Sequence, residues 1–110
     1  MGFIATVVYP NNENTKFDMD YYLNKHMPLV QKHFGSHGLK HWEVASYDKT
    51  LTGEKSPWSV QAILFWESEA GAKRAADTNH EEAKVVFGDV PNFTNEAPTL
   101  LWGKTEGSTR

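Results

Sequence analysis

The run from Trp58 to Trp66, WSVQAILFW, constrains the fold of this chain more than any other segment. It is rich in β-branched and aromatic residues, which predict a strand. One side of that strand carries Trp58, Val60, Ala62, Leu64 and Trp66, and the other side carries Ile63 and Phe65. A strand with one face in water alternates apolar and polar residues. This one does not, so both faces of its sheet must be covered.

Three more strands are predicted, at residues 3–9, 39–47 and 99–104. Helical segments are predicted at 17–35 and at 69–78, the second with Ser68 as its N-cap. Asn79-His80 interrupts the second segment, and a further helical turn or two follows at 81–87. The order is therefore βαββαβ. It indicates an α+β, ferredoxin-like fold in which a four-stranded antiparallel sheet carries both helices on one face.

The length of 110 residues predicts one domain, which we place at 1–105, with a flexible tail at 106–110. The net charge of -3 and the lack of a basic stripe argue against nucleic acid as a partner. The chain contains no apolar run long enough to cross a bilayer and no signal peptide, so we expect a cytoplasmic protein without a membrane partner. Because it contains no cysteine, disulfides and thiolate chemistry are excluded.

Two helices can cover only one face of the predicted sheet. The simplest cover for the other face is a second copy of the chain, packed face to face about a two-fold axis. We therefore expect a homodimer whose two sheets form a barrel-like core. The alternative is that the loop at 48–57 or the C-terminus folds over the sheet, although both segments are polar and short.

The helical segment at 17–35 has Asp18 as its predicted N-cap and Gly35 as its predicted stop. Pro28 lacks the N–H that would bond the carbonyl of Asn24, so we expect a kink near His26 or a break into two helices. Helical spacing predicts a buried stripe of Leu23, Met27, Val30 and Phe34.

A second line on this helix carries Tyr22 and, one turn later, His26. His26 thus lies at the edge of the buried face, where a kink at Pro28 can open a pocket. The alternative is that the proline only bends the helix around the sheet, and that His26 is a hydrogen-bonded boundary residue without chemistry.

The cluster His26-Met27-Pro28-Leu29, preceded by Tyr21-Tyr22 on a helix after the first strand, resembles the EthD family, named for ethyl tert-butyl ether degradation. The loop Asp89-Val90-Pro91-Asn92-Phe93 before the last strand is also similar. The resemblance covers nearly the whole chain and implies the dimeric α+β barrel fold. It implies that the histidine matched by His26 lines a pocket between helix and sheet. It also implies relatives that include cofactor-free monooxygenases, muconolactone isomerases and polyketide cyclases or dehydratases.

A neutral imidazole in an apolar pocket can act as a general base or acid. His26 can then remove a proton from a phenol or from a carbon beside a carbonyl, while Tyr22 donates to the developing oxyanion. We predict these two residues as catalytic. Aromatic and apolar side chains can hold a flat ligand, and the predicted substrate-binding residues are Leu29, Trp42, Trp66, Phe93 and Trp102.

Two other functions fit the same residues. The pocket can carry a hydrophobic small molecule for a partner oxygenase without chemistry of its own, or the barrel can be a structural or stress protein with no working pocket. Whether the protein is an enzyme is therefore left open between an oxidoreductase, an isomerase or dehydratase, and a binding protein.

The sequence predicts no metal site, because its five histidines match no ligand spacing and no H-E-x-x-H motif is present. We expect a protein without a cofactor. Haem is the alternative, because some members of the superfamily bind it through a histidine, and His26 and His80 are then the candidate ligands. A solvent-exposed capping residue is the other interpretation of His80.

Overall fold

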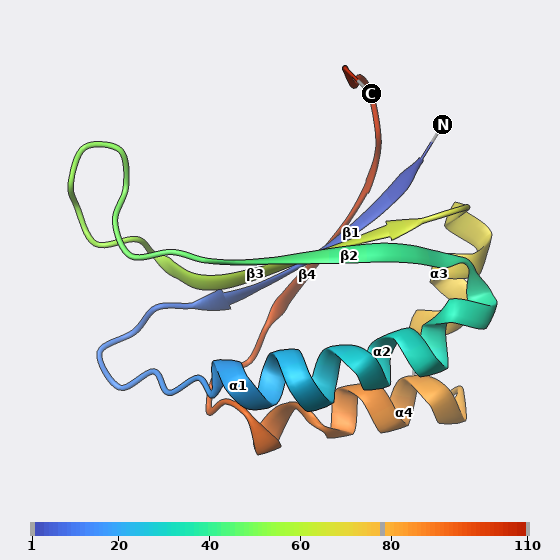
Figure 1. Ribbon diagram of the computed structural model, residues 1–110, viewed down its shortest axis with the longest axis horizontal. Helices are drawn as coiled ribbons and strands as arrows, with labels where there is room; N and C mark the ends of the chain where they lie inside the picture. Colours follow the sequence, from blue (N-terminus) through green and yellow to red (C-terminus); the bar gives the residue numbers. More distant parts are fainter. Residues whose placement is uncertain (1, 78, 110) are drawn as a thin grey trace.

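A computed structural model describes residues 2–77 and 79–109, and it shows one four-stranded antiparallel sheet with the helices on one of its faces (Figure 1). Met1, Thr78 and Arg110 lie outside the described residues. They are the first residue of the predicted domain, the last residue of the helical segment predicted at 69–78 and the last residue of the predicted tail. The strands are β1 (Phe3–Pro10), β2 (Leu39–Ser46), β3 (Trp58–Trp66) and β4 (Thr99–Lys104), in the spatial order β2-β3-β1-β4. The predicted α+β, ferredoxin-like arrangement is confirmed.

The register of the sheet places the largest apolar side chains of neighbouring strands on the face beneath the helices. Ala5 of β1 pairs with Leu64 of β3 on one side and with Trp102 of β4 on the other. Residues two positions apart share a face, so Phe3, Ala5 and Tyr9 lie with Val60, Ala62, Leu64 and Trp66 in one buried layer.

The first helical segment is continuous but contains one wide turn. It consists of α1 (Met19–Tyr21), a π-helical turn η1 (Tyr22–His26) and α2 (Met27–Phe34). Asp18 caps it as predicted, since its carboxylate accepts the N–H of Tyr21 at 3.0 Å. In the wide turn the N–H of Met27 bonds the carbonyl five residues back, at Tyr22. The irregularity expected from Pro28 is therefore a π turn immediately before it and not a break.

The extra residue of this wide turn changes which side chains face the sheet. Met27, Val30 and Phe34 are buried as predicted, but Leu23 is 39% exposed, so its predicted place in the buried stripe is wrong. A π turn takes up one more residue than an α turn. Residues before it are rotated relative to those after it, and Tyr22 takes the buried position instead.

The α-helix stops as predicted, since α2 ends at Phe34 with Gly35 as its C-cap. Gly35 keeps right-handed helical angles and opens a 3₁₀ turn, η2 (Gly35–His37). The chain leaves the helix at Gly38, whose φ of 103° is the left-handed conformation that glycine adopts at no steric cost. Of these two glycines, Gly35 ends the α-helix and Gly38 ends the 3₁₀ turn that follows it.

The second helical segment is divided, as the Asn79-His80 interruption predicted. Ser68 caps α3 (Glu69–Ala76) by accepting the N–H of Gly71 at 3.1 Å. His80 caps α4 (Glu81–Gly88), accepting the N–H of Glu82 at 3.3 Å, and a 3₁₀ turn, η3 (Val90–Asn92), follows. None of the helices formed by the described residues has the length and apolar character needed to cross a membrane.

The sheet face away from the helices has no helix over it (Figure 1). One rung across its middle joins Ile63, Thr6 and Leu101, and Leu101 is 56% exposed. The β2–β3 loop borders a hollow at one end of this face, beside Val8. C-terminal residues such as Thr105 border another hollow, beside Phe65. The loop at 48–57 and the C-terminus, which were the alternative cover for this face, thus lie at its ends. The middle of the face stays open to solvent.

Candidate functional site

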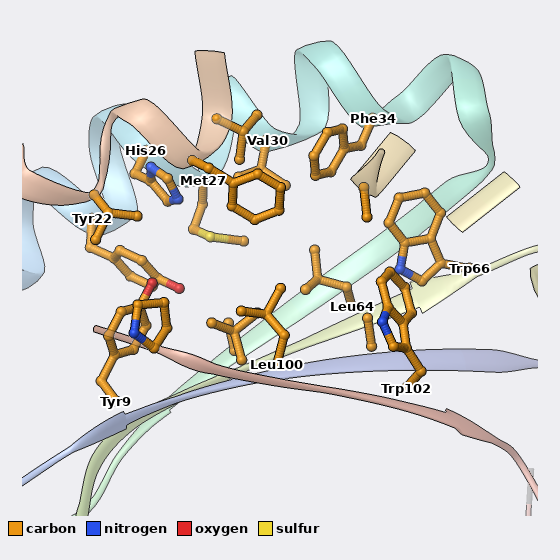
Figure 2. Close-up of a pocket in the computed structure, with 18 residues that line it drawn as sticks. Tyr9, Tyr22, His26, Met27, Val30, Phe34, Leu64, Trp66, Leu100 and Trp102 are labelled. Carbon is orange, nitrogen blue, oxygen red and sulfur yellow. The ribbon is translucent and has the colours of Figure 1, made fainter. Parts of the chain in front are cut away.

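The helices and the sheet enclose an apolar cavity, with His26 and Tyr22 at one end and Trp66 and Trp102 at the other (Figure 2). The space inside it that the centre of a water molecule can occupy is about 50 Å³. The walls between the two ends are aliphatic and aromatic: Ala5, Val7, Tyr9, Met27, Val30, Phe34, Ala62, Leu64, Val86 and Leu100. Leu100 and Trp102 are 37% and 42% exposed, so the cavity opens beside β4, an edge strand.

His26 is buried, only 4% exposed, and its ring is held on three sides. Nδ1 lies 2.9 Å from Oδ2 of Asp89. Tyr22 stacks nearly parallel to the imidazole, with ring centroids 5.2 Å apart and planes at 15°. Phe93 packs against it with centroids 4.6 Å apart. The π turn that carries Tyr22 and His26 is thus what brings both side chains to the cavity.

Asp89 holds the imidazole through one oxygen and is itself held through the other. Its Oδ1 accepts the hydroxyl of Tyr21 at 2.7 Å and the side-chain amide of Asn92 at 2.9 Å. Burial by itself raises the pKa of Asp89, but the hydrogen bonds from Asn92, Tyr21 and His26 outweigh it and leave the pKa of this carboxyl below its usual value. Asp89 is therefore ionised near neutral pH.

An ionised carboxylate only accepts hydrogen bonds, so Nδ1 of His26 must carry the proton that it donates to Asp89. Burial lowers the pKa of the His26 imidazole, and Asp89 offsets part of that lowering. The ring is then neutral near pH 7, and the lone pair is on Nε2. A carboxylate that fixes the tautomer of a histidine is the arrangement that general-base catalysis requires.

Tyr22 lies beside His26 and is 1% exposed. Burial raises the pKa of its phenol far above the ordinary value, and the neighbouring Tyr9 adds to the effect. Burial likewise raises the pKa of Tyr9 to about 12, with the Tyr22 hydroxyl offsetting part of the rise. Both phenols therefore keep their protons at any physiological pH. Because the two hydroxyls are hydrogen-bonded to each other, the pair has one O–H left to donate to an oxygen in the cavity.

The far end of the cavity contains an unsatisfied donor. Trp66 is 3% exposed, and its indole Nε1 is buried without a hydrogen-bond partner among the described residues. Buried donors are nearly always paired, because leaving one unpaired costs about 1–3 kcal/mol. Since Trp66 lines the cavity, an acceptor inside the cavity is the natural partner for this N–H.

The structure brings together most of the residues that the sequence proposed. Tyr22, His26, Trp66 and Trp102 line the cavity. Phe93 is buried and touches His26 and Tyr22 from behind, so it supports the site without being among the lining residues. Leu29 and Trp42 are partly buried and are not among the lining residues either.

Three residues of the site were missed by sequence reasoning: Asp89, Tyr21 and Asn92. Each lies in a segment that the family resemblance had singled out, but none had been given a role. Asp89 is 63 residues from His26 in the chain, and this pairing forms only when the end of α4 lies beside the π turn. The only sequence signals for this pairing were a histidine at the edge of a buried helix face and an acidic residue in a loop.

A second group of histidines gathers elsewhere. His37, His80 and Glu82 place a ligand atom each within 4.8 Å of one another, although the sequence spacing had predicted no metal site. His80 belongs to this group and does not line the cavity. The two histidines considered for haem therefore do not share a site, and the described residues do not fit a haem held by both.

No protein-family model matches the sequence, and no curated protein sequence matches it. Solved structures do. An EthD-like protein from Ralstonia eutropha superposes with a TM-score of 0.84 at 24% identity, covering 99% of this chain and 97% of the other. An ethyl tert-butyl ether degradation (EthD) family protein from Bacillus halodurans gives a TM-score of 0.72 at 22% identity, with 94% and 98% covered.

More distant neighbours share the same architecture. SnoaB, a cofactor-independent oxygenase from Streptomyces nogalater, gives a TM-score of 0.62 at 7% identity and covers 98% of this chain and 95% of its own. Several further neighbours are described as dimeric ferredoxin-like proteins. At these identities the likeness establishes the fold, and the chain therefore has the ferredoxin-like fold of the EthD-like structures.

Proposed function

We propose that this chain is an EthD-like protein that binds a small hydrophobic or aromatic molecule in the cavity beneath its helices and carries out acid–base chemistry on it without a cofactor. The observation that carries the proposal is the His26–Asp89 pair, with its basic Nε2 at the end of an apolar cavity. The cofactor-independent oxygenase among the structural neighbours supports it as an analogy of fold.

The cavity suggests the chemical class of the ligand. Its apolar walls suit a flat, apolar ligand. The unpaired N–H of Trp66 would bond a hydrogen-bond acceptor on that ligand, at the end of the cavity away from His26. At the other end His26 removes a proton, and the phenol of Tyr22 stabilises the negative charge that develops. A phenol or a ketone with an acidic C–H bond, carrying a second oxygen, meets these requirements.

Proton abstraction is the step to test first, because isomerisation, dehydration and reaction with oxygen can all begin with it. 2-Tetralone in D₂O exchanges its α-protons at a rate that proton NMR measures directly. The wild-type protein should accelerate the exchange, and His26→Gln should lose about 10²-fold or more of that acceleration, the usual contribution of a general base. His33→Gln is the matched control, since His33 lies on the same helix and is not among the residues that line the cavity. Equal rates for wild type and His26→Gln would contradict the proposal.

Ligand affinity tests the role of Trp66 separately. We expect the wild-type protein to bind 1-tetralone more tightly than tetralin, which lacks the carbonyl, by the roughly 3- to 10-fold worth of one hydrogen bond. Trp66→Phe should lose that preference. Comparing two ligands in each protein removes the effect of the smaller ring. If the ketones bind but 2-tetralone exchange is not accelerated even by the wild type, the protein is a carrier for a hydrophobic molecule, our alternative.

We also propose that the protein works as a homodimer, packed through the open sheet face. Ile63, Phe65 and Leu101 lie on that face beside polar residues, and no helix covers them. A monomer would leave them in water, whereas a second copy about a two-fold axis buries both faces at once. The dimeric ferredoxin-like neighbours support this assembly.

A further inference from the structure

Helices α2 and α4 lie side by side (Figure 1), and side chains join them near both ends. At one end His26, just before α2, bonds Asp89, just after α4. At the other end a second set of side chains meets: His33 near the end of α2, His37 in η2, and His80 and Glu82 at the start of α4. We call these four residues the histidine–glutamate cluster. The catalytic proposal above does not use it.

Glu82 is the centre of the cluster. Its Oε1 lies 3.0 Å from Nε2 of His37 and 3.8 Å from Nδ1 of His80. Its Oε2 lies 3.5 Å from Nδ1 of His33. The rings of His37 and His80 meet edge to face with centroids 5.3 Å apart. Three imidazole rings therefore lie close around the two oxygens of one carboxylate.

Two histidines and a carboxylate are a ligand set that Zn²⁺ favours, with bond lengths of about 2.0–2.2 Å. Two ligands of a tetrahedral ion at those lengths lie roughly 3.4 Å apart. The ligand atoms of His37, His80 and Glu82 all lie within 4.8 Å of one another, with two of the separations at 3.0 and 3.8 Å. We propose that His37, His80 and Glu82 form a binding site for Zn²⁺ or a chemically similar divalent transition metal.

Metal binding exchanges two hydrogen bonds for metal–ligand bonds. The ion takes the place of the proton that Nε2 of His37 donates to Glu82, because imidazole and carboxylate must both be deprotonated as ligands. The lone pair of His80 Nδ1 now accepts the N–H of Glu82 at the cap of α4, and an ion that binds Nδ1 leaves this N–H to water. His33 approaches the other oxygen of Glu82, where it either orients the carboxylate or supplies a fourth ligand.

The site is accessible from solvent and rigidly supported. The side chains of His37, Glu82 and His80 are 14%, 31% and 41% exposed, so an ion can enter from water. The backbone of His37 is pressed against α3, where a side chain at Gly71 would collide with its carbonyl oxygen. Three ligands from the protein leave one position for His33 or water. A bound ion fastens α2 and its 3₁₀ turn to α4 at the end opposite the His26–Asp89 pair.

The test uses Co²⁺ as a visible probe and Zn²⁺ as a competitor, on full-length protein freed of metal with a chelator. Tetrahedral Co²⁺ should give d–d absorption bands that saturate at one ion per chain, and Zn²⁺ should abolish them. Zn²⁺ should also raise Tm, since an ion that binds only the folded state stabilises it by mass action. Glu82→Gln keeps the shape of the side chain and should weaken Zn²⁺ binding at least tenfold, as should His37→Ala.

His41→Ala is the control, because His41 and Glu43 form a comparable exposed pair 3.7 Å apart, outside the cluster. It should bind Co²⁺ and Zn²⁺ as the wild type does. Circular dichroism shows whether each variant is folded. If His37→Ala has lost its fold, Glu82→Gln decides the question. Absent saturable bands, or equal affinities in wild type and folded Glu82→Gln, would overturn the proposed site. So would an equal loss in His41→Ala, which would mean adventitious binding by surface histidines. None of these readouts depends on catalysis, so the metal site and the proposed function fail independently.

Discussion

At the scale of single residues, the site depends on how burial and one carboxylate act together on His26. Burial alone would make the imidazole neutral but would leave its tautomer undetermined. Asp89 fixes the proton on Nδ1 and raises the pKa of the ring part of the way back. Tyr21 and Asn92 bond the same carboxylate from its other side, so Asp89 is positioned before any ligand arrives.

Replacing Asp89 by asparagine should lower the pKa of His26 further, because the carboxylate that favours the protonated ring is lost while burial remains. An NMR titration of the His26 ring protons measures this shift directly. The same variant should slow proton abstraction, since the amide no longer dictates which nitrogen carries the proton. Asp48→Asn, in the exposed β2–β3 loop, should leave the titration unchanged. An unchanged His26 pKa in Asp89→Asn would show that the pair has no electrostatic role.

At the scale of the elements, close packing of α3 against η2, the turn that follows α2, fixes the position of the histidine–glutamate cluster. Gly71 makes this packing possible. A Cβ there would lie 2.0 Å from the carbonyl oxygen of His37, well inside van der Waals contact. The position therefore needs glycine for space, and not for an unusual backbone angle.

Gly71→Ala should destabilise the protein by about 1–3 kcal/mol, as overpacking of a well-packed site does. Gly88→Ala is the matched control, because Gly88 closes α4 and a Cβ there meets nothing within 4 Å. Alanine is the better helix former, so the control should be neutral or up to about 1 kcal/mol more stable. Urea unfolding at one protein concentration measures both. Equal stabilities for the two variants would mean that α3 can move away from His37 at little cost.

At the scale of the whole molecule, two proposed properties depend on the complete fold: assembly of two copies through the open sheet face, and a dependence of stability on pH. The first follows from apolar residues on the uncovered face. The second follows from an imidazole that is buried only when the chain is folded.

Ile63→Glu should convert a dimer into a monomer, because a charge in the middle of the open face would be buried against its own copy in a two-fold interface. Light scattering coupled to size exclusion should give about 25 kDa for the wild type, twice the chain mass of 12.5 kDa, and about half of that for the variant. Val85→Glu, on an exposed position of α4, is the control and should remain dimeric. A wild-type protein that elutes as a monomer would refute the assembly.

His26 should make the protein less stable as the pH falls. The pKa of its folded-state imidazole is lowered from the ordinary value of about 6.5. Between the two pKa values the unfolded chain binds more protons, so stability is fully present above the unfolded pKa and declines as the pH falls toward the folded one. The lowered pKa of Asp89 acts in the same direction, but only near and below pH 4.

Urea unfolding at pH 7.5 and pH 5.5 should therefore show a larger loss of stability for the wild type than for His26→Gln. Lys25→Gln, at an exposed residue of the same helical turn, should keep the wild-type loss. A His26→Gln protein with the full wild-type loss would mean that the imidazole titrates alike in the folded and unfolded chain.

The sequence by itself determined the order of the elements and put His26 and Tyr22 one turn apart on one helix, because these follow from local patterns: the β-branched and aromatic run Trp58–Trp66, helical spacing, and caps at Asp18 and Ser68. It also suggested that Trp66 and Trp102 share a pocket. Only the tertiary structure decided the rest. The π turn before Pro28 moved Tyr22 into the core in place of Leu23. The left-handed angle fell at Gly38 and not Gly35. Asp89 reached His26, and Glu82 reached His33 and His37, across distances in sequence at which no local pattern gives a signal.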